Sequence, residues 1–326
     1  MTSTIEAAIQ SALAAIGTRG KPNNMYFVAC GGSFSQMHAA KYALERESKS
    51  IAADTYSSAE FIARNSPRLG KSSVVVLCSK SGDTPETVAA ARFAKERGAY
   101  TIGLTAKGDS PLAQAVDTRL DYDATPDASS ADIPSAIVLR VAFGVLAKFE
   151  ANAKYDAVIA GLAKLPAILA TAQAQHREAT LAWAQERKRE TVMYTMASGS
   201  NYGVAYLWAC CILQEMQWIH SQAIHSGEYF HGPFEITDFD VPFVLLKGLG
   251  DCRNMDQRAL DFAGKYSNKV LEIDANGFDF EGVDEGVREY LTPFVFLPLL
   301  RAYAVALSEA RGHPLTVRRY MWKMEY

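Results

Sequence analysis

The chain repeats one local pattern that few folds can accommodate: a short apolar run, a turn rich in Gly and Ser, and then a helical segment. Met25 to Cys30 (MYFVAC) is rich in aromatic and β-branched residues and stops at Gly31-Gly32-Ser33 before a helical segment. The pattern recurs at Ser73 to Ser79 (SVVVLCS) and again at residues 100–106. Strands that alternate with helices predict a parallel sheet covered by helices on both faces.

A second series of the same kind begins at Thr191 to Asn201 (TVMYTMASGSN), which has the same aromatic start, the same Ala and a similar Gly/Ser turn. A duplication of this length in a chain of 326 residues predicts two α/β units. We expect an N-terminal helix over residues 1–20, a first domain over 21–152, a helical connection over 153–190, and a second domain with a C-terminal tail over 191–326.

The composition narrows the possible partners. Apolar residues make up 49% of the chain and charged residues 21%, which is enough apolar material for two cores. A net charge of −3 disfavours nucleic acid as a partner, whereas a few amides and hydroxyls can still hold a small anion. The N-terminus lacks a signal-peptide pattern and no run reaches about 18 uncharged apolar residues, so we expect a cytoplasmic protein without a membrane partner. The five cysteines lack Cys-x-x-Cys spacing and are expected to be reduced, buried thiols.

The segment Ser79 to Thr84 (SKSGDT) is the best candidate for a ligand-binding loop. Ligands of open α/β sheets bind beyond the carboxyl ends of the strands, where the following helix presents free amides. Gly82 permits unusual dihedral angles and Thr84 suits the N-cap of the next helix. The three hydroxyl groups of the segment are therefore expected to bind one phosphate. A plain capped helix explains the same residues, and Asp83 favours this alternative because a carboxylate repels an anion unless it faces away.

The turn Cys30-Gly31-Gly32-Ser33 follows the preceding strand, and Ser33 is expected to reach the same ligand across the strand ends. The turn does not have the GxGxxG pattern of dinucleotide sites, and the chain has no GxxxxGK[ST] motif. Nucleotide binding in its usual modes is therefore disfavoured.

Two titratable residues stand at suitable places for proton transfer. Glu215 ends an otherwise apolar helical segment, Val204 to Trp218, and a carboxylate at the edge of a core is suited to moving protons. His231 lies sixteen residues later, between an aromatic residue and a Gly-Pro break, and an imidazole can exchange a proton with a sugar ring oxygen. A solvated glutamate and a histidine that caps a turn are the structural alternatives.

The two turns together resemble the paired signature of sugar-isomerase (SIS) domains: CGGS followed by SKSGDTPET. The whole chain resembles the isomerase module of glucosamine-6-phosphate synthase and the fructoselysine-6-phosphate deglycases. The resemblance implies two tandem flavodoxin-like SIS domains, each a parallel sheet flanked by helices. It also implies that a sugar phosphate is the ligand, with Lys80 at a place where the synthase has Gln. The residues expected to contact substrate are Gly31, Gly32, Ser33, Ser79, Lys80, Ser81, Thr84, Ser198, Glu228 and Lys323.

The resemblance extends to the catalytic spacing, a Glu followed sixteen residues later by the His of GExxHGP. Carried over, Glu215 would shuttle a proton between C1 and C2 of the sugar and His231 would assist ring opening. The same motif includes Glu228, which would bind or orient the substrate. In this family the histidine reaches the active site from the neighbouring subunit, which implies a homodimer that can associate further.

Three features favour the deglycases over the synthase. The chain has no N-terminal glutaminase domain, has Ile212 where the synthase has a Lys, and ends in RRYMWKMEY, which resembles the deglycase tail. In that tail, Arg319 and Lys323 are candidates to close over the site. The implied reaction converts a ketoamine 6-phosphate to glucose 6-phosphate and an amine, and it needs no metal or organic cofactor because the substrate supplies the nitrogen.

Two alternatives stay open at the level of sequence. A deaminase or isomerase of simple hexosamine 6-phosphates needs the same loop, acid and histidine. A non-catalytic sugar-phosphate-binding regulator needs only the loop, although no helix-turn-helix segment precedes the first domain and Glu215 and His231 would then be idle.

Overall fold

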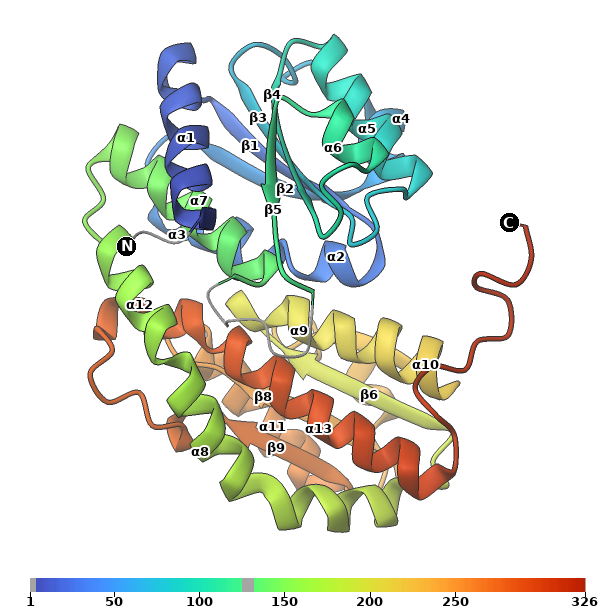
Figure 1. The fold of residues 1–326 in the computed structure, drawn as a ribbon. Helices are drawn as coiled ribbons and strands as arrows, with labels where there is room; N and C mark the ends of the chain where they lie inside the picture. Colours follow the sequence, from blue (N-terminus) through green and yellow to red (C-terminus); the bar gives the residue numbers. More distant parts are fainter. Residues whose placement is uncertain (1–3, 125–131, 326) are drawn as a thin grey trace. The chain divides into compact units, whose positions relative to one another are not determined.

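The computed structural model describes residues 4–124 and 132–325, and the chain divides into two compact units: unit 1, Met1–Ala163, and unit 2, Lys164–Tyr326. Each unit is built on a parallel β-sheet with helices on both faces (Figure 1). The predicted fold class, two tandem α/β units, is confirmed.

The sheet of unit 1 has the strand order β2-β1-β3-β4-β5, and all of its neighbouring strands are parallel. Its strands are β1 (Asn24–Ala29), β2 (Ala52–Ser57), β3 (Ser73–Cys78), β4 (Tyr100–Thr105) and β5 (Thr118–Asp121). The three middle strands are buried along their whole length, as their apolar sequences predict. The order is that of flavodoxin-like folds, in which ligands bind at the switch point between β1 and β3.

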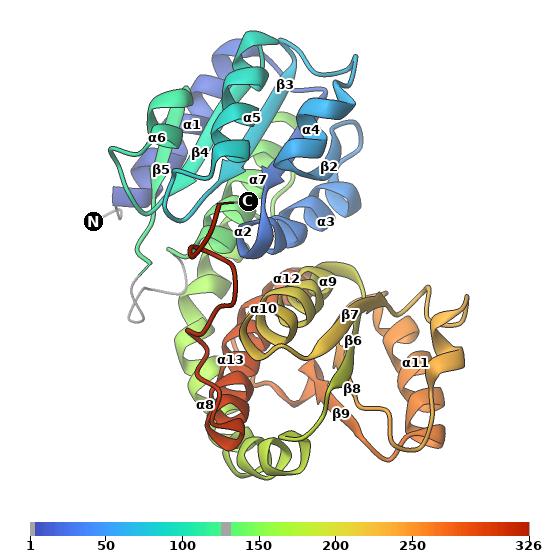
Figure 2. The same ribbon diagram turned by 90° about the vertical axis from the view of Figure 1, so that its right-hand side faces the viewer.

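Helices cover both faces of this sheet (Figure 2). One face carries α1 (Thr4–Arg19), α3 (His38–Glu47) and α7 (Pro134–Glu150), and the other carries α4 (Ser58–Arg64), α5 (Pro85–Glu96) and α6 (Pro111–Ala115). A short helix, α2 (Gly31–Ser35), follows β1 directly. The turn after β1 and the loop after β3 thus both lead into helices at the carboxyl ends of these neighbouring parallel strands.

Unit 2 repeats this arrangement with the order β7-β6-β8-β9, so that β6 corresponds to β1 and β8 to β3. Its strands are β6 (Val192–Ala197), β7 (His220–His225), β8 (Phe243–Lys247) and β9 (Val270–Asp274). One face is covered by α9 (Tyr202–Tyr206), α10 (Glu215–Gln217), α12 (Glu285–Leu291) and α13 (Pro293–Arg311), and the other by α11 (Arg253–Tyr266) (Figure 2). The long helix α8 (Tyr155–Arg187) precedes β6 in the sequence.

Three of the four edge strands were not predicted from the sequence. β2 (AADTYS), β5 (TRLD) and β7 (HSQAIH) are mostly polar and only partly buried. An apolar run marks a strand that is buried on both faces, so a search for such runs finds the central strands and misses these three.

Two helical stretches, Tyr155–Arg187 and Glu285–Arg311, are long and apolar enough to cross a membrane by length and composition alone. In Glu285–Arg311, 72% of the apolar window is buried inside the structure, which is the arrangement of a core helix. The corresponding share in Tyr155–Arg187 is 33%.

Candidate active site

The loop after β3 has its hydroxyl groups side by side. Ser79 is buried, and its Oγ lies 2.8 Å from Oγ1 of Thr84 and accepts a hydrogen bond from the Gly82 amide at 3.1 Å. Lys80 is exposed, and its carbonyl accepts a hydrogen bond from the Ala106 amide at 3.1 Å. The loop is therefore compact, and its two inner hydroxyls are already oriented by neighbours.

Gly82 is required by this geometry. Its φ of +70° lies in the left-handed region, and a Cβ atom at this position would lie 2.1 Å from Oγ of Ser110. The Gly82 carbonyl also accepts a hydrogen bond from the Leu112 amide at 2.8 Å. The loop is thus held against the start of α6, and any other residue at Gly82 would displace it.

Thr84 and Ser81 both make side-chain contacts within the loop. Thr84 is the N-cap residue of α5, but its side chain makes no capping hydrogen bond because its hydroxyl pairs with Ser79. The Ser81 hydroxyl donates to the carboxylate of Asp83. An anion bound in this loop would have to replace Asp83 as the acceptor of the Ser81 hydroxyl. Because Asp83 is exposed, its carboxylate can turn into water when it loses this hydrogen bond.

The turn after β1 places Ser33 beside the end of β3. Gly31, with φ of +54°, and Gly32 begin α2, and Ser33 is half-buried in the same helix. Burial raises the pKa of Cys78 to about 11, and a hydrogen bond from Ser33 acts in the opposite direction. Since Cys78 directly precedes Ser79, Ser33 lies at the carboxyl end of β3 beside the hydroxyl-rich loop.

Glu215 follows a stretch of π-helix that the sequence analysis did not foresee. The π-helix, Leu207–Gln214, leads into α10, which ends at Gln217, and the next residue, Trp218, has a φ of +56°. A π-helical segment is rare and is often found at functional sites. The segment is apolar on nearly every face, so its sequence carries no periodic signal that separates α from π winding. The result is a half-buried Glu215 close to the end of the helix.

An arginine of the C-terminal tail pairs with Glu215. Nη2 of Arg318 lies 2.6 Å from Oε1 of Glu215, and the two side chains are 8% and 23% exposed. The same guanidinium donates to the carbonyls of Leu315 and Val317 at 2.8 and 2.9 Å. Arg319 was a candidate from the sequence and Arg318 was not. The sequence of two adjacent arginines does not indicate which side chain points toward the core.

The tail is fastened at the end of α10 by further contacts. The guanidinium of Arg319 lies 4.0 Å from the centre of the Trp218 ring, and the Gln217 side chain donates to the His313 carbonyl at 2.8 Å. Lys323 is exposed, and its amide donates to the Tyr320 carbonyl at 2.8 Å. The tail thus lies over the helix that carries Glu215.

The cysteines near these residues are not activated thiols. Burial raises the pKa of Cys211 to about 12, and the charge of Glu215 adds to this rise. All five cysteines are free, as predicted. The prediction that they are buried is correct for Cys78 and Cys211, whereas Cys30, Cys210 and Cys252 are only partly buried.

His231 and Glu228 lie in the turn after β7, and both are exposed. The His231 amide donates to the Glu228 carbonyl at 3.0 Å, so the main chain closes the turn and the imidazole is not needed as a cap. Within the described residues 164–325, no hydrogen bond or ion pair joins the side chains of Glu215 and His231.

Ser198 has a different environment from the other residues predicted to contact substrate. It is 1% exposed, and its hydroxyl lies 2.7 Å from Oδ1 of Asp256 and 3.2 Å from the Cys252 carbonyl. A separate groove in unit 2, with a volume of about 450 Å³, is lined by Phe230 and by residues of α11 and contains none of the predicted site residues.

Three comparisons bear on the class of protein. Residues 20–147 match the SIS domain family. The chain is 49% identical over 304 residues to the fructosamine deglycase FrlB of Bacillus subtilis, covering 93% of each protein. It is 27% identical over 298 residues to a fructoselysine 6-phosphate deglycase of Escherichia coli, covering 91% of this chain and 85% of the relative. A crystal structure from Bacillus subtilis, of a protein proposed to be a phosphosugar isomerase, has 48% identity and a TM-score of 0.96 and covers 98% of this chain and 97% of that one.

Two flavodoxin-like units with a hydroxyl-rich loop at one switch point define a protein of the double sugar-isomerase class. Within that class, the chain belongs to the SIS-domain family that includes the fructosamine deglycase FrlB. With this identity over nearly the whole chain, it is an enzyme of the phosphosugar isomerase and deglycase type.

Proposed function

We propose that the protein is a fructosamine-6-phosphate deglycase, which converts a ketoamine sugar 6-phosphate to glucose 6-phosphate and a free amine or amino acid. The observation that carries the proposal is the 49% identity over 93% of the chain to a fructosamine deglycase. The substrate named for the second relative carries a 6-phosphate, and the hydroxyl-rich loop of unit 1 suits such a group.

The phosphate is held by Ser33, Ser79, Lys80, Ser81 and Thr84. The Ser79 and Thr84 hydroxyls are already placed by each other and by the Gly82 amide, so they need little reorganisation to donate to phosphate oxygens. The exposed ammonium of Lys80 adds a positive charge at the mouth of the loop. The two glycines of the turn after β1 leave space for the sugar to approach the backbone.

Glu215 carries out the proton transfer. It removes a proton from C1 of the open-chain ketoamine, the electron pair forms the C1–C2 double bond of an enaminol, and the C2 oxygen takes up a proton. Return of a proton to C2 produces an imine at C1, and water hydrolyses this imine to the aldehyde of glucose 6-phosphate and the free amine. The ion pair with Arg318 engages Oε1 of Glu215, which leaves Oε2 to accept the proton.

His231 assists opening of the cyclic ketoamine by exchanging a proton with the ring oxygen, and Glu228 orients the substrate beside it. In a homodimer the histidine is supplied by the neighbouring subunit, and the exposed position of His231 on its turn agrees with such a role. Lys323 of the tail contacts the bound substrate.

The test is a panel of substrates at equal concentrations: fructoselysine 6-phosphate, other fructosyl-amino acid 6-phosphates, unphosphorylated fructoselysine and glucosamine 6-phosphate. Glucose 6-phosphate formation and amine release are measured separately. We expect equal amounts of both products from the ketoamine phosphates and, without the phosphate, a loss of at least about 100-fold in kcat/KM. Turnover of glucosamine 6-phosphate alone would show that the protein is a hexosamine-phosphate enzyme instead, and binding without any turnover would favour a regulator.

The shared site can be tested by mixing two inactive variants, Glu215→Gln and His231→Ala, after unfolding and refolding together. If the histidine comes from the neighbouring subunit, each mixed dimer has one intact pair, and random mixing restores about one quarter of the wild-type activity. No recovery in dimers shown to be mixed would contradict a shared site.

A further inference from the structure

The two switch points are built from corresponding residues. Cys30 follows β1 and Ser58 follows β2, just as Ser198 follows β6 and Ser226 follows β7. Each switch point has a third such residue, in the first turn of the helix that follows β3 or β8. This residue is Thr87 in α5 of unit 1 and Asp256 in α11 of unit 2.

In unit 1 these residues form a neutral floor beneath the hydroxyl-rich loop. Oγ of Ser58 and Oγ1 of Thr87 are 2.9 Å apart, and Thr87 lies 4.0 Å from the sulfur of Cys30. Ser58 and Thr87 are both fully buried. A floor of two hydroxyls and a thiol brings no charge to the position where a phosphate would bind above it.

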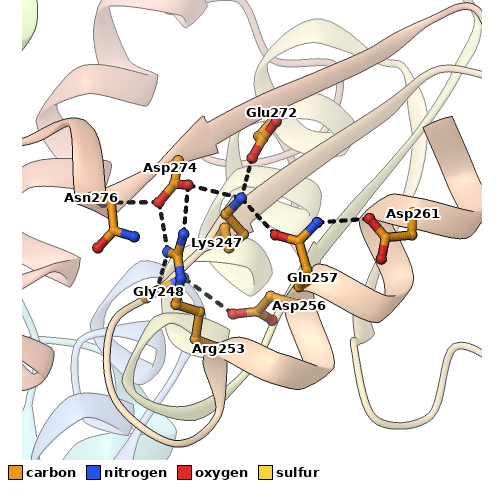
Figure 3. Close-up of polar contacts among 9 residues, drawn as sticks. All are labelled: Lys247, Gly248, Arg253, Asp256, Gln257, Asp261, Glu272, Asp274 and Asn276. Carbon is orange, nitrogen blue, oxygen red and sulfur yellow. Dashed lines mark hydrogen bonds and ion pairs between the residues drawn. The ribbon is translucent and has the colours of Figure 1, made fainter.

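In unit 2 the same place holds a carboxylate. Oδ1 of the fully buried Asp256 accepts hydrogen bonds from Ser226 at 2.6 Å and Ser198 at 2.7 Å. Its Oδ2 accepts the amide of Gly248 at 3.1 Å (Figure 3). Gly248 directly follows β8, so its amide is one of the donors that a ligand at this switch point would otherwise use.

The cations near this loop are also engaged. By strand register, Lys247 of β8 corresponds to Ser79 of unit 1, and its ammonium contacts Glu272 at 2.6 Å and Asp274 at 2.8 Å (Figure 3). Arg253 donates to both carboxylate oxygens of Asp274 at 2.6 and 2.7 Å. Neither cation is therefore left to attract an external anion.

A second acidic residue stands against the same loop. A Cβ atom at Gly250, where φ is +78°, would lie 2.2 Å from Oε2 of Glu289. The carboxylates of Glu289 and Asp256 thus both contact the loop of unit 2. In the loop of unit 1 the partly buried contact is between the hydroxyls of Ser79 and Thr84, and the carboxylate of Asp83 is exposed to water. Since like charges repel strongly where water is excluded, an incoming phosphate meets a barrier in unit 2 that unit 1 lacks.

We propose that Asp256 closes the switch point of unit 2 to anionic ligands, and that each chain has one sugar-phosphate site, in unit 1, which the neutral Thr87 keeps open. This inference rests on the proposed function of the unit 1 loop. On this inference the Ser198 hydroxyl is bound to Asp256 and does not contact the substrate. Thr87 then determines that unit 1, and not unit 2, binds the sugar phosphate.

The test uses sorbitol 6-phosphate, an open-chain sugar phosphate that carries no amine to be cleaved, in calorimetric titrations of the full chain. We expect one molecule bound per chain, and binding that is about 10- to 100-fold weaker in the Ser79→Ala variant. Thr87→Asp reproduces the unit 2 floor in unit 1, and Thr87→Asn is the uncharged control of the same size. We expect the Asp variant to bind at least about 30-fold more weakly than the Asn variant.

Two molecules bound per chain, or a site that keeps its full affinity in Ser79→Ala, would overturn the inference, and these measurements do not depend on the folding of a Thr87 variant. Equal binding by folded Thr87→Asp and Thr87→Asn would overturn the role of Thr87. Binding of one molecule without cleavage of any ketoamine phosphate would remove the proposed activity and leave the inference intact. A wild-type chain that binds no sorbitol 6-phosphate would overturn both.

Discussion

The switch points of the two units have the same strand order and the same parallel register, yet their chemistry differs. In unit 1 the strand ends carry hydroxyls above a neutral floor of Cys30, Ser58 and Thr87. In unit 2 the corresponding donors are taken by the buried carboxylate of Asp256. Two units of the same architecture can thus differ in what their switch points contact through the exchange of a few side chains. Unit 2 also carries Glu215 with its partner Arg318.

The largest effect is expected from Glu215→Gln, which separates chemistry in unit 2 from binding in unit 1. The amide cannot accept the C1 proton, so kcat should fall by about 10³-fold or more, while sorbitol 6-phosphate binding changes little. Steady-state kinetics and titration measure the two quantities. The exposed Glu178→Gln of α8 is the matched control. A variant that keeps its kcat would rule out Glu215 as the base.

Alanine at the two corresponding floor positions should affect stability unequally. Asp256→Ala leaves the Ser226 hydroxyl and the Gly248 amide buried without an acceptor, whereas Ser198 keeps the Cys252 carbonyl, so the free energy of unfolding of unit 2 should fall by about 3 kcal/mol. Thr87→Ala removes one neutral hydrogen bond and should cost about 1 kcal/mol. Denaturant titrations with probes in each unit measure both values. Equal losses would mean that the carboxylate holds its loop no more firmly than a hydroxyl does.

Ser79→Ala should weaken ligand binding without much change in the chemical step. Loss of a hydrogen bond to a charged phosphate is expected to raise KM about 10- to 100-fold, with a smaller change in kcat. Ser72→Ala, at an exposed position just before β3, is the control. A fall in kcat at unchanged KM would mean that the loop acts in the reaction itself.

The smallest effect concerns pH. Burial raises the pKa of Asp117, but hydrogen bonds from Thr101 and the ion pair with Lys95 outweigh it, so the net pKa is below the ordinary 3.8. For Asp256, burial outweighs its hydrogen bonds and the net pKa is above 3.8. A lowered pKa contributes stability that is present above pH 3.8 and is lost below it, whereas a raised pKa makes the protein gain stability as pH falls toward 3.8.

The stability deficit of Asp117→Asn relative to wild type should therefore shrink as the pH falls from 7 through 3.8 to about 3, whereas that of Asp256→Asn should grow. Unfolding titrations over this pH range measure both deficits. If both stability deficits grew, or both shrank, as the pH fell, the pKa values of Asp117 and Asp256 would not be shifted in opposite directions.

Much of the fold could be predicted from local sequence. The runs that form β1, β3, β4 and β6 were recognisable because these strands are largely apolar. The edge strands β2, β5 and β7 were not, since they are mixed in polarity. The π-helix before Glu215 was also missed, because an apolar segment has the same appearance in either winding.

The sequence by itself determined the two α/β units, the hydroxyl-rich loop after β3 and the candidate pair Glu215 and His231, because strands, turns and motifs are encoded by neighbouring residues. The tertiary structure decided what these groups contact: Arg318 beside Glu215, Thr84 bonded to Ser79 instead of capping its helix, and Asp256 under the loop of unit 2. These contacts join residues from different elements, and partner choice depends on which side chains the packed strand ends bring within hydrogen-bond distance.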